Sequence, residues 1–296
     1  MNSIITAKHL SEREQYAGRK WYYRFREIPE FFEESDCKKV ATGMAVRYSR
    51  ITRSWNKERN SEWICRIYLA AKLILAASIQ LEARNFAISK NLRIVDPYLA
   101  YYAVLSLLRA IVLTLPEQEW ADGHIITLSH KKILNIATDH IARFDAGVAS
   151  TVNGLALRLR ASRELISYWH PSSGDRNVQL EVDVERVSTL FSEIAQFNSE
   201  ILEQSILKRA PVESFDFLPE YIQKLSNIEL HGQNFFDGED AYRLGYLRRK
   251  YPAPPNIQHV MTEGHVEDFF GAWASEGDPD GGFDPDSNWR LIFDVP

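Results

Sequence analysis

The chain has 296 residues, enough for one large domain or two ordinary domains with a buried core. Hydrophobic residues make up 45% and charged residues 25%, which excludes a disordered or fibrous chain. The net charge of −5 is uneven, because residues 1–210 hold 29 Lys and Arg against 24 Asp and Glu, whereas residues 211–296 hold 6 against 16. A basic body with an acidic end suits an anionic ligand on the first part, although uneven surface charge alone also explains it.

Cysteine usage and hydropathy indicate where the protein works. The two cysteines, Cys37 and Cys65, exclude a disulfide framework and a zinc–cysteine site, and they fit a reducing compartment. Residues 1–8 have no long apolar core, so no signal peptide is expected. The most apolar stretch, residues 97–116, carries Arg109 near its middle, which would cost about 3 kcal/mol at the centre of a membrane. We therefore expect a soluble, cytoplasmic protein without a membrane span.

Helices are expected from the start of the chain. A capping-box spacing predicts a helix over residues 11–27, which Pro29 would end. A second helix is expected over residues 35–55. These two segments predict an N-terminal helical extension over residues 1–60.

Five long helices with short joints are expected over residues 61–208, because apolar residues recur every three to four positions. Their ranges are 63–86, 97–115, 129–145, 148–170 and 183–208. The second of them begins with a capping Asp96 and Pro97, and its apolar circumference places it at the centre. Helices joined in this way predict an antiparallel bundle.

The last part, residues 209–296, has shorter segments, many aromatic residues and an acidic charge. Helical fragments are expected near 218–225, 239–250 and 266–274, and a short strand near 289–295. The predicted fold class is therefore all-α: an antiparallel helical bundle with an N-terminal helical extension and a small, mixed C-terminal region.

The candidate catalytic residues are Arg163 and His170, seven positions apart in a predicted helix. Seven residues turn about 700°, so these two side chains share one face with Arg160 and Ser167. Pro171 places His170 at the end of the helix. Arginine binds phosphate and histidine moves protons, so the stripe favours RNA cleavage through 2′-hydroxyl attack, without metal or cofactor. A capping histidine beside solvated arginines explains the same spacing without chemistry.

The segment 159–170, followed by a loop and residues 182–191, resembles the signature of HEPN domains. These are helical bundles, and many are ribonucleases of prokaryotic toxin–antitoxin and antiviral defence systems. Their pattern is an arginine, four to six residues and a histidine, and the gap here is six. The apolar helix near residues 97–110 is also similar to the aromatic and alanine-rich core helix of such domains. The resemblance covers roughly residues 60–208.

The resemblance implies Arg163 and His170 as the catalytic pair, RNA as the substrate and no metal. It also implies a homodimer whose two motifs share a cleft, and an antitoxin or defence-complex protein as a partner. Glu164 and Ser172 depart from the family pattern, which often has a small polar residue or Asp and a Tyr at these positions. These departures keep a second interpretation open, a non-catalytic helical protein–protein interaction subunit.

A second basic face consists of Arg47, Arg50, Arg53 and Lys57, with Trp55 between them. At this spacing it would guide a phosphate backbone while the aromatic ring stacks on bases. A solvated basic surface is the alternative interpretation.

Four histidines outside the motif are candidates for phosphate contacts, core positions or metal ligands. His130, in the sequence Ser129-His-Lys-Lys132, offers phosphate contacts at a helix N-terminus, although capping and surface charge explain it equally well. His140 is expected in the core. His259 and His265 lie near acidic residues, but standard metal-ligand spacing is missing. The acidic loop 278–286 lacks the spacing of a calcium loop, so no metal site is expected.

Overall fold

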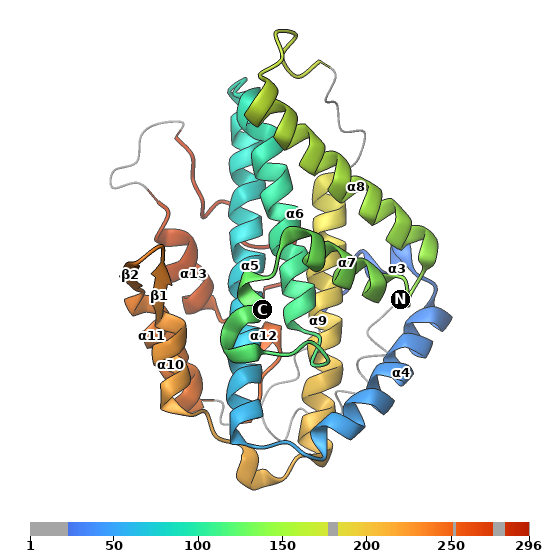
Figure 1. Ribbon diagram of the computed structural model, residues 1–296, viewed down its shortest axis with the longest axis vertical. Coiled ribbons are helices and arrows are strands. Elements are labelled where there is room, and N and C mark those ends of the chain that lie inside the picture. The colour runs from blue at the N-terminus through green and yellow to red at the C-terminus, as the bar shows by residue number, and fades with distance from the viewer. Residues whose placement is uncertain (1–22, 177–182, 251–252, 275–281, 296) are drawn as a thin grey trace.

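The computed structural model describes residues 23–176, 183–250, 253–274 and 282–295. It confirms the all-α class, with long helices packed against one another (Figure 1). The large helices are α4 (Glu34–Thr52), α5 (Lys57–Ser89), α6 (Asp96–Leu113), α7 (His130–Ile141), α8 (Ala146–Glu164) and α9 (Val184–Arg209). Shorter helical turns are α3 (Ile28–Phe31), η1 (Arg93–Val95), η2 (Ala121–Thr127), η3 (Leu165–Trp169) and η4 (Val212–Ser214).

Helix α6 lies at the centre, as its apolar circumference predicted. It packs against α5, α7, α8 and α9, while α4 packs on α9 (Figure 1). Ala103, Leu107 and Ile111 of α6 are completely buried. Burial of an apolar helix on all sides is what organises the other helices around it.

Side-chain caps begin several of these helices. Asn56, Ser129, Asp145 and Asp183 each accept a hydrogen bond from a backbone N–H of the first turn of α5, α7, α8 and α9. The expected cap at Asp96 is wrong, because Val95 occupies the N-cap position and Asp96 is the first residue of α6. The Asp96 carboxylate binds the Arg84 guanidinium of α5 instead.

Helix α9 carries buried polar residues that fasten both ends of the chain to the bundle. The Glu193 carboxylate accepts hydrogen bonds from the backbone N–H groups of Arg26, Glu27 and Ile28. Burial raises the pKa of Glu193 to about 7, against the opposing effect of these three amides. At the other end of α9, the Asn256 amide donates to Glu203 at 2.9 Å. Glu193 and Glu203 of α9 are therefore bound by segments that lie far from them in the sequence.

The helix expected over residues 35–55 is present as α4, whereas the helix expected over residues 11–27 is wrong in the part that the structure describes. Residues 11–22 of the expected helix lie outside the described residues, and residues 23–27 are not helical. Pro29 does not end a helix but lies in the first turn of α3. Proline fits this position because the first N–H groups of a helix have no intrahelical partner.

The predicted domain limits can be placed on the elements. The limit at residue 60 falls inside α5, and the limit at residue 208 falls in the last turn of α9. One core cluster contains Tyr48, Leu107 and Phe270, which come from the three predicted parts.

The C-terminal region contains the three expected helical fragments as α10 (Pro219–Ser226), α11 (Gly238–Lys250) and α13 (Glu263–Gly271), together with the short α12 (Ile257–Val260). A hairpin that the sequence analysis missed joins β1 (Asn227–Leu230) to antiparallel β2 (Gln233–Phe236). His231 and Gly232 both have positive φ in its two-residue turn, a geometry that matches the twist of a hairpin.

The strand expected near residues 289–295 is wrong. This segment is irregular, and it buries Ile292 and Phe293 in the core. Ser192 of α9 donates a hydrogen bond to the Ile292 carbonyl. The apolar pattern therefore reflects burial of an irregular segment and not pairing in a sheet.

Two helical segments are long and apolar enough to cross a membrane, α5 and residues 93–113. In their most apolar windows, 67% and 56% of the residues are buried inside the protein. Core burial accounts for their composition, and Arg109 lies within the second segment with its guanidinium hydrogen bonded to the Ile126 and Leu128 carbonyls.

Candidate nucleic-acid interface

The helix that carries the candidate residues Arg160, Arg163, Ser167 and His170 ends differently from the prediction. Helix α8 stops at Glu164 and continues as the π-helical turn η3, and His170 then adopts a left-handed conformation with φ of 40°. A π turn contains more residues than an α turn, so seven residues no longer complete two turns. Pro171 disfavours helical geometry at His170, which explains why the helix ends there.

This ending changes the relation between Arg163 and His170. In the described part of the chain, no hydrogen bond or ion pair joins the two side chains. The Arg163 side chain is only 15% exposed, whereas His170 is exposed. The structure therefore fixes the guanidinium inside a network and leaves the imidazole at the surface.

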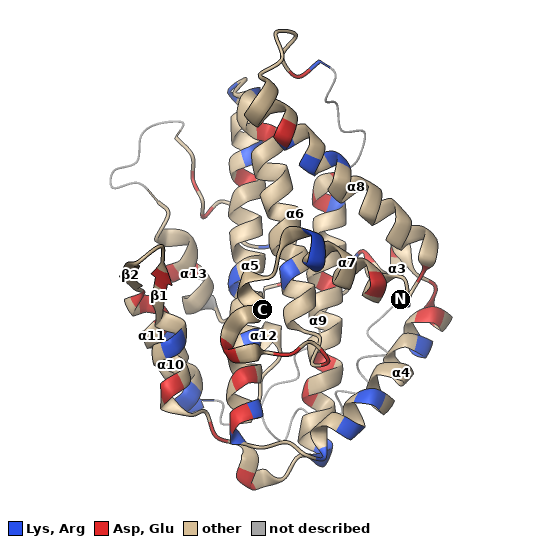
Figure 2. Ribbon diagram, in the orientation of Figure 1, with Lys and Arg blue, Asp and Glu red and all other residues tan. Residues whose placement is uncertain are grey.

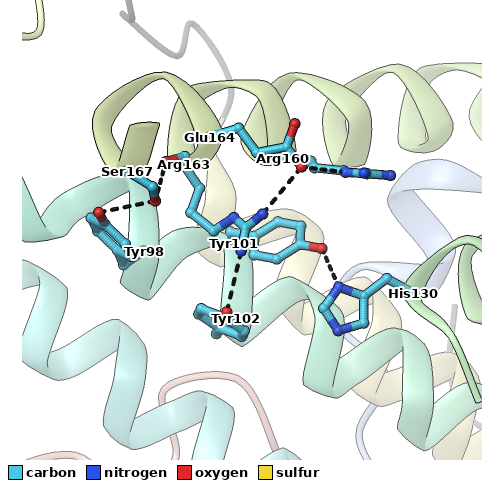
Figure 3. A network of polar contacts seen from close by, with 8 residues as sticks. All are labelled: Tyr98, Tyr101, Tyr102, His130, Arg160, Arg163, Glu164 and Ser167. Carbon is cyan, nitrogen blue, oxygen red and sulfur yellow. Dashed lines mark hydrogen bonds and ion pairs between the residues drawn. The ribbon is translucent and has the colours of Figure 1, made fainter. Parts of the chain in front are cut away.

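Arg163 is held by three neighbours (Figure 3). Its guanidinium lies 5.0 Å from the centre of the Tyr101 ring, and its Nη1 lies 3.4 Å from the Tyr102 hydroxyl. Its Nη2 lies 3.1 Å from Glu164 Oε1, which also accepts from Arg160 Nε at 2.8 Å. Two guanidinium groups thus converge on one carboxylate oxygen, and the hydrogen bond from Arg160 holds the pKa of Glu164 below its usual value.

Ser167, the fourth residue of the predicted stripe, acts within the helix end. Its hydroxyl donates to the Arg163 carbonyl at 2.7 Å, and its oxygen lies 3.0 Å from the hydroxyl oxygen of Tyr98 on α6 (Figure 3). These contacts tie the end of α8 to α6. Ser167 positions Arg163 in this structure.

His130 is the imidazole that the structure connects to Arg163. Its Nδ1 lies 2.7 Å from the hydroxyl oxygen of Tyr101, and the ring of Tyr101 makes a cation–π contact with the Arg163 guanidinium (Figure 3). Burial and the charges of Arg109 and Arg163 lower the pKa of His130. From the sequence, His130 could be predicted only to lie at the N-terminus of a helix. Its connection to Arg163 was not predictable, because the two residues meet through Tyr101, which belongs to a third helix.

Arg109 holds the start of α7 in place. Its two terminal nitrogens donate to the carbonyl oxygens of Ile126 and Leu128, at 2.6 and 3.0 Å. Both carbonyls come just before the helix that begins at His130. Arg109 therefore positions this imidazole beside Tyr101.

A pocket of about 400 Å³ opens beside this network, between α6, α7 and α8. Its floor is apolar and includes Val104, Leu105 and Leu108. Its polar lining residues are Tyr101, His130, Lys131, Asn135, Asn153 and Arg160. An apolar floor with a few cationic and amide groups suits a planar group that carries a negative charge nearby.

Two large aromatic residues are exposed where α8 ends. Tyr168 is 72% exposed and Trp169 is 78% exposed, and both precede His170 directly. Single-stranded nucleic acids bind to such rings by base stacking, next to cationic groups that contact the backbone.

The second predicted basic face is only partly as expected. Arg47 and Arg50 lie on α4, but α4 ends at Thr52, so Arg53 is its C-cap and Lys57 begins α5. Figure 2 shows basic residues along α4. Arg47 Nε is paired with Glu117 at 3.1 Å, while Arg50 and Arg53 are exposed.

The aromatic part of that prediction is wrong. Trp55 is 6% exposed and belongs to the core, where its indole nitrogen donates to Asn60. With only 6% of its surface exposed, the ring does not interleave with the arginines as a surface for base stacking. This basic face therefore presents exposed arginines to a phosphate backbone but no aromatic ring for base stacking.

His140, His259 and His265, the other histidines that the sequence pattern singled out, are buried. His140 is buried in the core, as expected, with its Nε2 at 2.9 Å from Asn198 Oδ1. His259 Nδ1 lies 3.2 Å from Glu203 Oε1 and takes part in the cap of α12. Among the described residues, no group of three His, Cys, Asp or Glu could hold a metal ion. Part of the acidic loop 278–286 lies outside the described residues.

Comparisons with models of protein families, with characterised proteins and with solved structures found no match to this chain.

Proposed function

We propose that this protein is a metal-independent endoribonuclease of HEPN type that binds single-stranded RNA at the end of α8. The observation that carries the proposal is the convergence of Arg160 and Arg163 on Glu164 Oε1, at 2.8 and 3.1 Å. Two guanidinium groups fixed around one anionic oxygen form the arrangement that binds a phosphate. RNA would take the place of the Glu164 carboxylate.

The exposed aromatic residues support an RNA strand at this site. Tyr168 and Trp169 offer ring faces to unpaired bases, and stacking of this kind contributes about 1–3 kcal/mol per base. Arg50 of α4 and Arg53, its C-cap, are exposed and would add backbone contacts that carry no sequence preference.

The reaction needs only groups of the protein and of RNA. The 2′-hydroxyl oxygen attacks the adjacent phosphorus, and the bond from phosphorus to the 5′-oxygen breaks. A histidine accepts the 2′-hydroxyl proton, the leaving 5′-oxygen takes up a proton, and a 2′,3′-cyclic phosphate and a 5′-hydroxyl result. Arg163 stabilises the charge that grows on the phosphate oxygens. We assign the proton transfer to His170, at the exposed end of the motif.

Cleavage of a labelled, unstructured RNA in EDTA by the purified protein tests the proposal. The expected products end in 2′,3′-cyclic phosphate, and both Arg163→Ala and His170→Ala reduce the rate at least a hundredfold. Arg158→Ala is the matched control on α8. His231→Ala is the control for His170, because His231 is also exposed and left-handed. Wild-type rates in both motif variants would refute the assignment.

His130 provides a built-in comparison. If His130→Ala abolishes cleavage while His170→Ala does not, the proton transfer belongs to the imidazole beside Tyr101. That outcome keeps the ribonuclease and rejects the role assigned to His170.

The proposal includes a homodimer in which two α8 ends share one cleft, an antitoxin or defence-complex partner, and action in the cytoplasm. Light scattering on the purified protein measures the first of these. A monomer that cleaves RNA would contradict the shared cleft.

A second candidate is a non-catalytic protein–protein interaction subunit. The observation that favours it is the hairpin, in which Ile228 and Phe235 pair across the strands and are 40% and 54% exposed. Uncovered apolar side chains of this size mark interaction surfaces. This candidate predicts a protein that forms stable complexes and does not turn over RNA.

A further inference from the structure

A second pocket is lined by residues of α5, α11 and α13 and shares none of its lining with the Arg163 network. Figure 1 shows the positions of these three helices. Its volume is about 380 Å³, which is the size of a small-molecule site. Its aromatic lining comes from Tyr68, Phe269 and Trp273. Trp273 is 65% exposed, so its ring is available to a ligand at the mouth of the pocket.

Two buried polar atoms of this lining have no hydrogen-bond partner within the described structure. They are His265 Nε2 and Arg243 Nε. His265 is only 5% exposed, and its ring lies 5.6 Å from that of Tyr68. Buried polar groups are normally paired, so two unpaired atoms in the lining of one pocket suit a ligand that can hydrogen-bond to them.

The charge of the lining limits what this ligand can be. Asp237, Glu239, Asp240 and Asp268 supply four carboxylates, whereas Lys72 and Arg243 supply two cations. The Lys72 ammonium binds Asp240 at 2.6 Å, and the Arg243 guanidinium binds Asp268. Both cations are thus already neutralised, and the surplus of carboxylates repels an anion.

His265 adds a neutral polar group to this environment. Burial and the charges of Arg243 and Lys72 lower its pKa to about 4. At neutral pH the ring is therefore uncharged, and its Nε2 can donate or accept a hydrogen bond according to the tautomer.

The required ligand combines four properties. The ligand has a flat ring that packs against Trp273, and an acceptor atom of this ring accepts a hydrogen bond from the Arg243 Nε–H. An amino group donates toward the acidic lining residues Asp237 and Glu239, and the molecule carries no phosphate. Adenine has this combination, because its ring nitrogens accept and its exocyclic amine donates.

We propose that the pocket between α5, α11 and α13 binds an uncharged adenine-type base or nucleoside. The ligand stacks on Trp273 and hydrogen-bonds to His265 and Arg243. This site is independent of the proposed ribonuclease activity, because it shares no residue with the Arg163 network.

Calorimetric titration of the full chain with adenosine tests the site. Inosine, which replaces the amine by a carbonyl, and AMP, which adds a phosphate, are the comparison ligands. We expect saturable binding of adenosine, and at least tenfold weaker binding of inosine and of AMP. Inosine also turns the N1 ring acceptor into an N–H donor, so it alters both the amine and a ring acceptor, whereas AMP adds the negative charge that the acidic lining disfavours.

Variants of the lining residues show whether adenosine binds in this pocket. Trp273→Ala and His265→Phe are expected to weaken adenosine binding at least tenfold. Phe236→Ala, at an exposed aromatic residue of the hairpin that does not line the pocket, is the matched control and should bind as the wild type does. Trp273 is largely exposed, so its variant keeps the test valid if His265→Phe fails to fold.

Three results would overturn the proposal: absence of saturable adenosine binding, preference for AMP, or wild-type affinity in Trp273→Ala. None of them bears on RNA cleavage, which is measured separately with the Arg163 and His170 variants.

Discussion

Tyr101 joins Arg163 to His130. Its ring lies beneath the guanidinium at 5.0 Å, and its hydroxyl oxygen lies 2.7 Å from the imidazole Nδ1 (Figure 3). The three residues come from α6, α8 and α7. One buried tyrosine thus contacts a guanidinium with its ring and an imidazole with its hydroxyl, so substitutions can separate the two contacts.

Tyr101→Phe keeps the ring and removes the hydroxyl. The free energy of unfolding should fall by about 1 kcal/mol, as for one lost hydrogen bond, while RNA affinity stays within twofold of wild type. Tyr101→Leu removes the ring as well, so RNA affinity should fall several-fold. Chemical denaturation and fluorescence anisotropy measure the two effects. Equal RNA affinity of the Phe and Leu variants would contradict the role of the ring.

Glu164→Gln removes the carboxylate that Arg160 and Arg163 share. RNA should bind more tightly, and the slope of log affinity against log salt should steepen by about 1, since more cationic charge is free to meet phosphate. Anisotropy titrations at several salt concentrations measure both. Glu34→Gln is the control, because Glu34 forms a comparable pair with Lys38 on α4. Weaker RNA binding by Glu164→Gln would show that the network is purely structural.

His170→Gly should stabilise the protein while abolishing cleavage. Glycine adopts the left-handed conformation without the steric cost of a side chain, which is about 1 kcal/mol here. His231→Gly should give a similar rise in stability and leave cleavage unchanged. Thermal unfolding and RNA cleavage are measured on both variants. If His170→Gly still cleaves at the wild-type rate, this histidine is only a cap of η3.

His140 should make the fold acid-sensitive. Burial lowers the pKa of this imidazole from 6.5 to about 3, so the unfolded chain takes up a proton below pH 6.5 before the folded protein does. Stability is therefore lost as pH falls through this range, by about 2 kcal/mol at pH 5.

His140→Gln keeps a donor for Asn198 and removes the titration, so its stability should fall less between pH 7 and 5. Glu193, whose pKa of about 7 acts in the opposite direction, is present in both proteins and cancels in the comparison. Denaturation curves at the two pH values provide the measurement. Parallel loss in both proteins would exclude His140 as the cause.

Apolar periodicity was enough to predict the long helices of the bundle and the central place of α6. Apolar periodicity is a local property, and burial of residues such as Leu107 and Ile111 follows from it directly. The caps at Ser129 and Asp183 are local as well, since each side chain reaches only three residues along its own helix. These features were therefore predictable without knowledge of distant contacts.

Which side chains meet at the candidate site depends on how the helices pack against one another. Helical spacing placed Arg163 with His170, but the π turn and Pro171 altered the phase of the helix, and packing of α6 against α7 and α8 brought His130 to Tyr101 instead. The polar face of α9 likewise has no local explanation, because Glu193 is satisfied by amides 165 to 167 residues away. Contacts between distant segments depend on how whole helices pack, and the pattern within one helix does not contain that information.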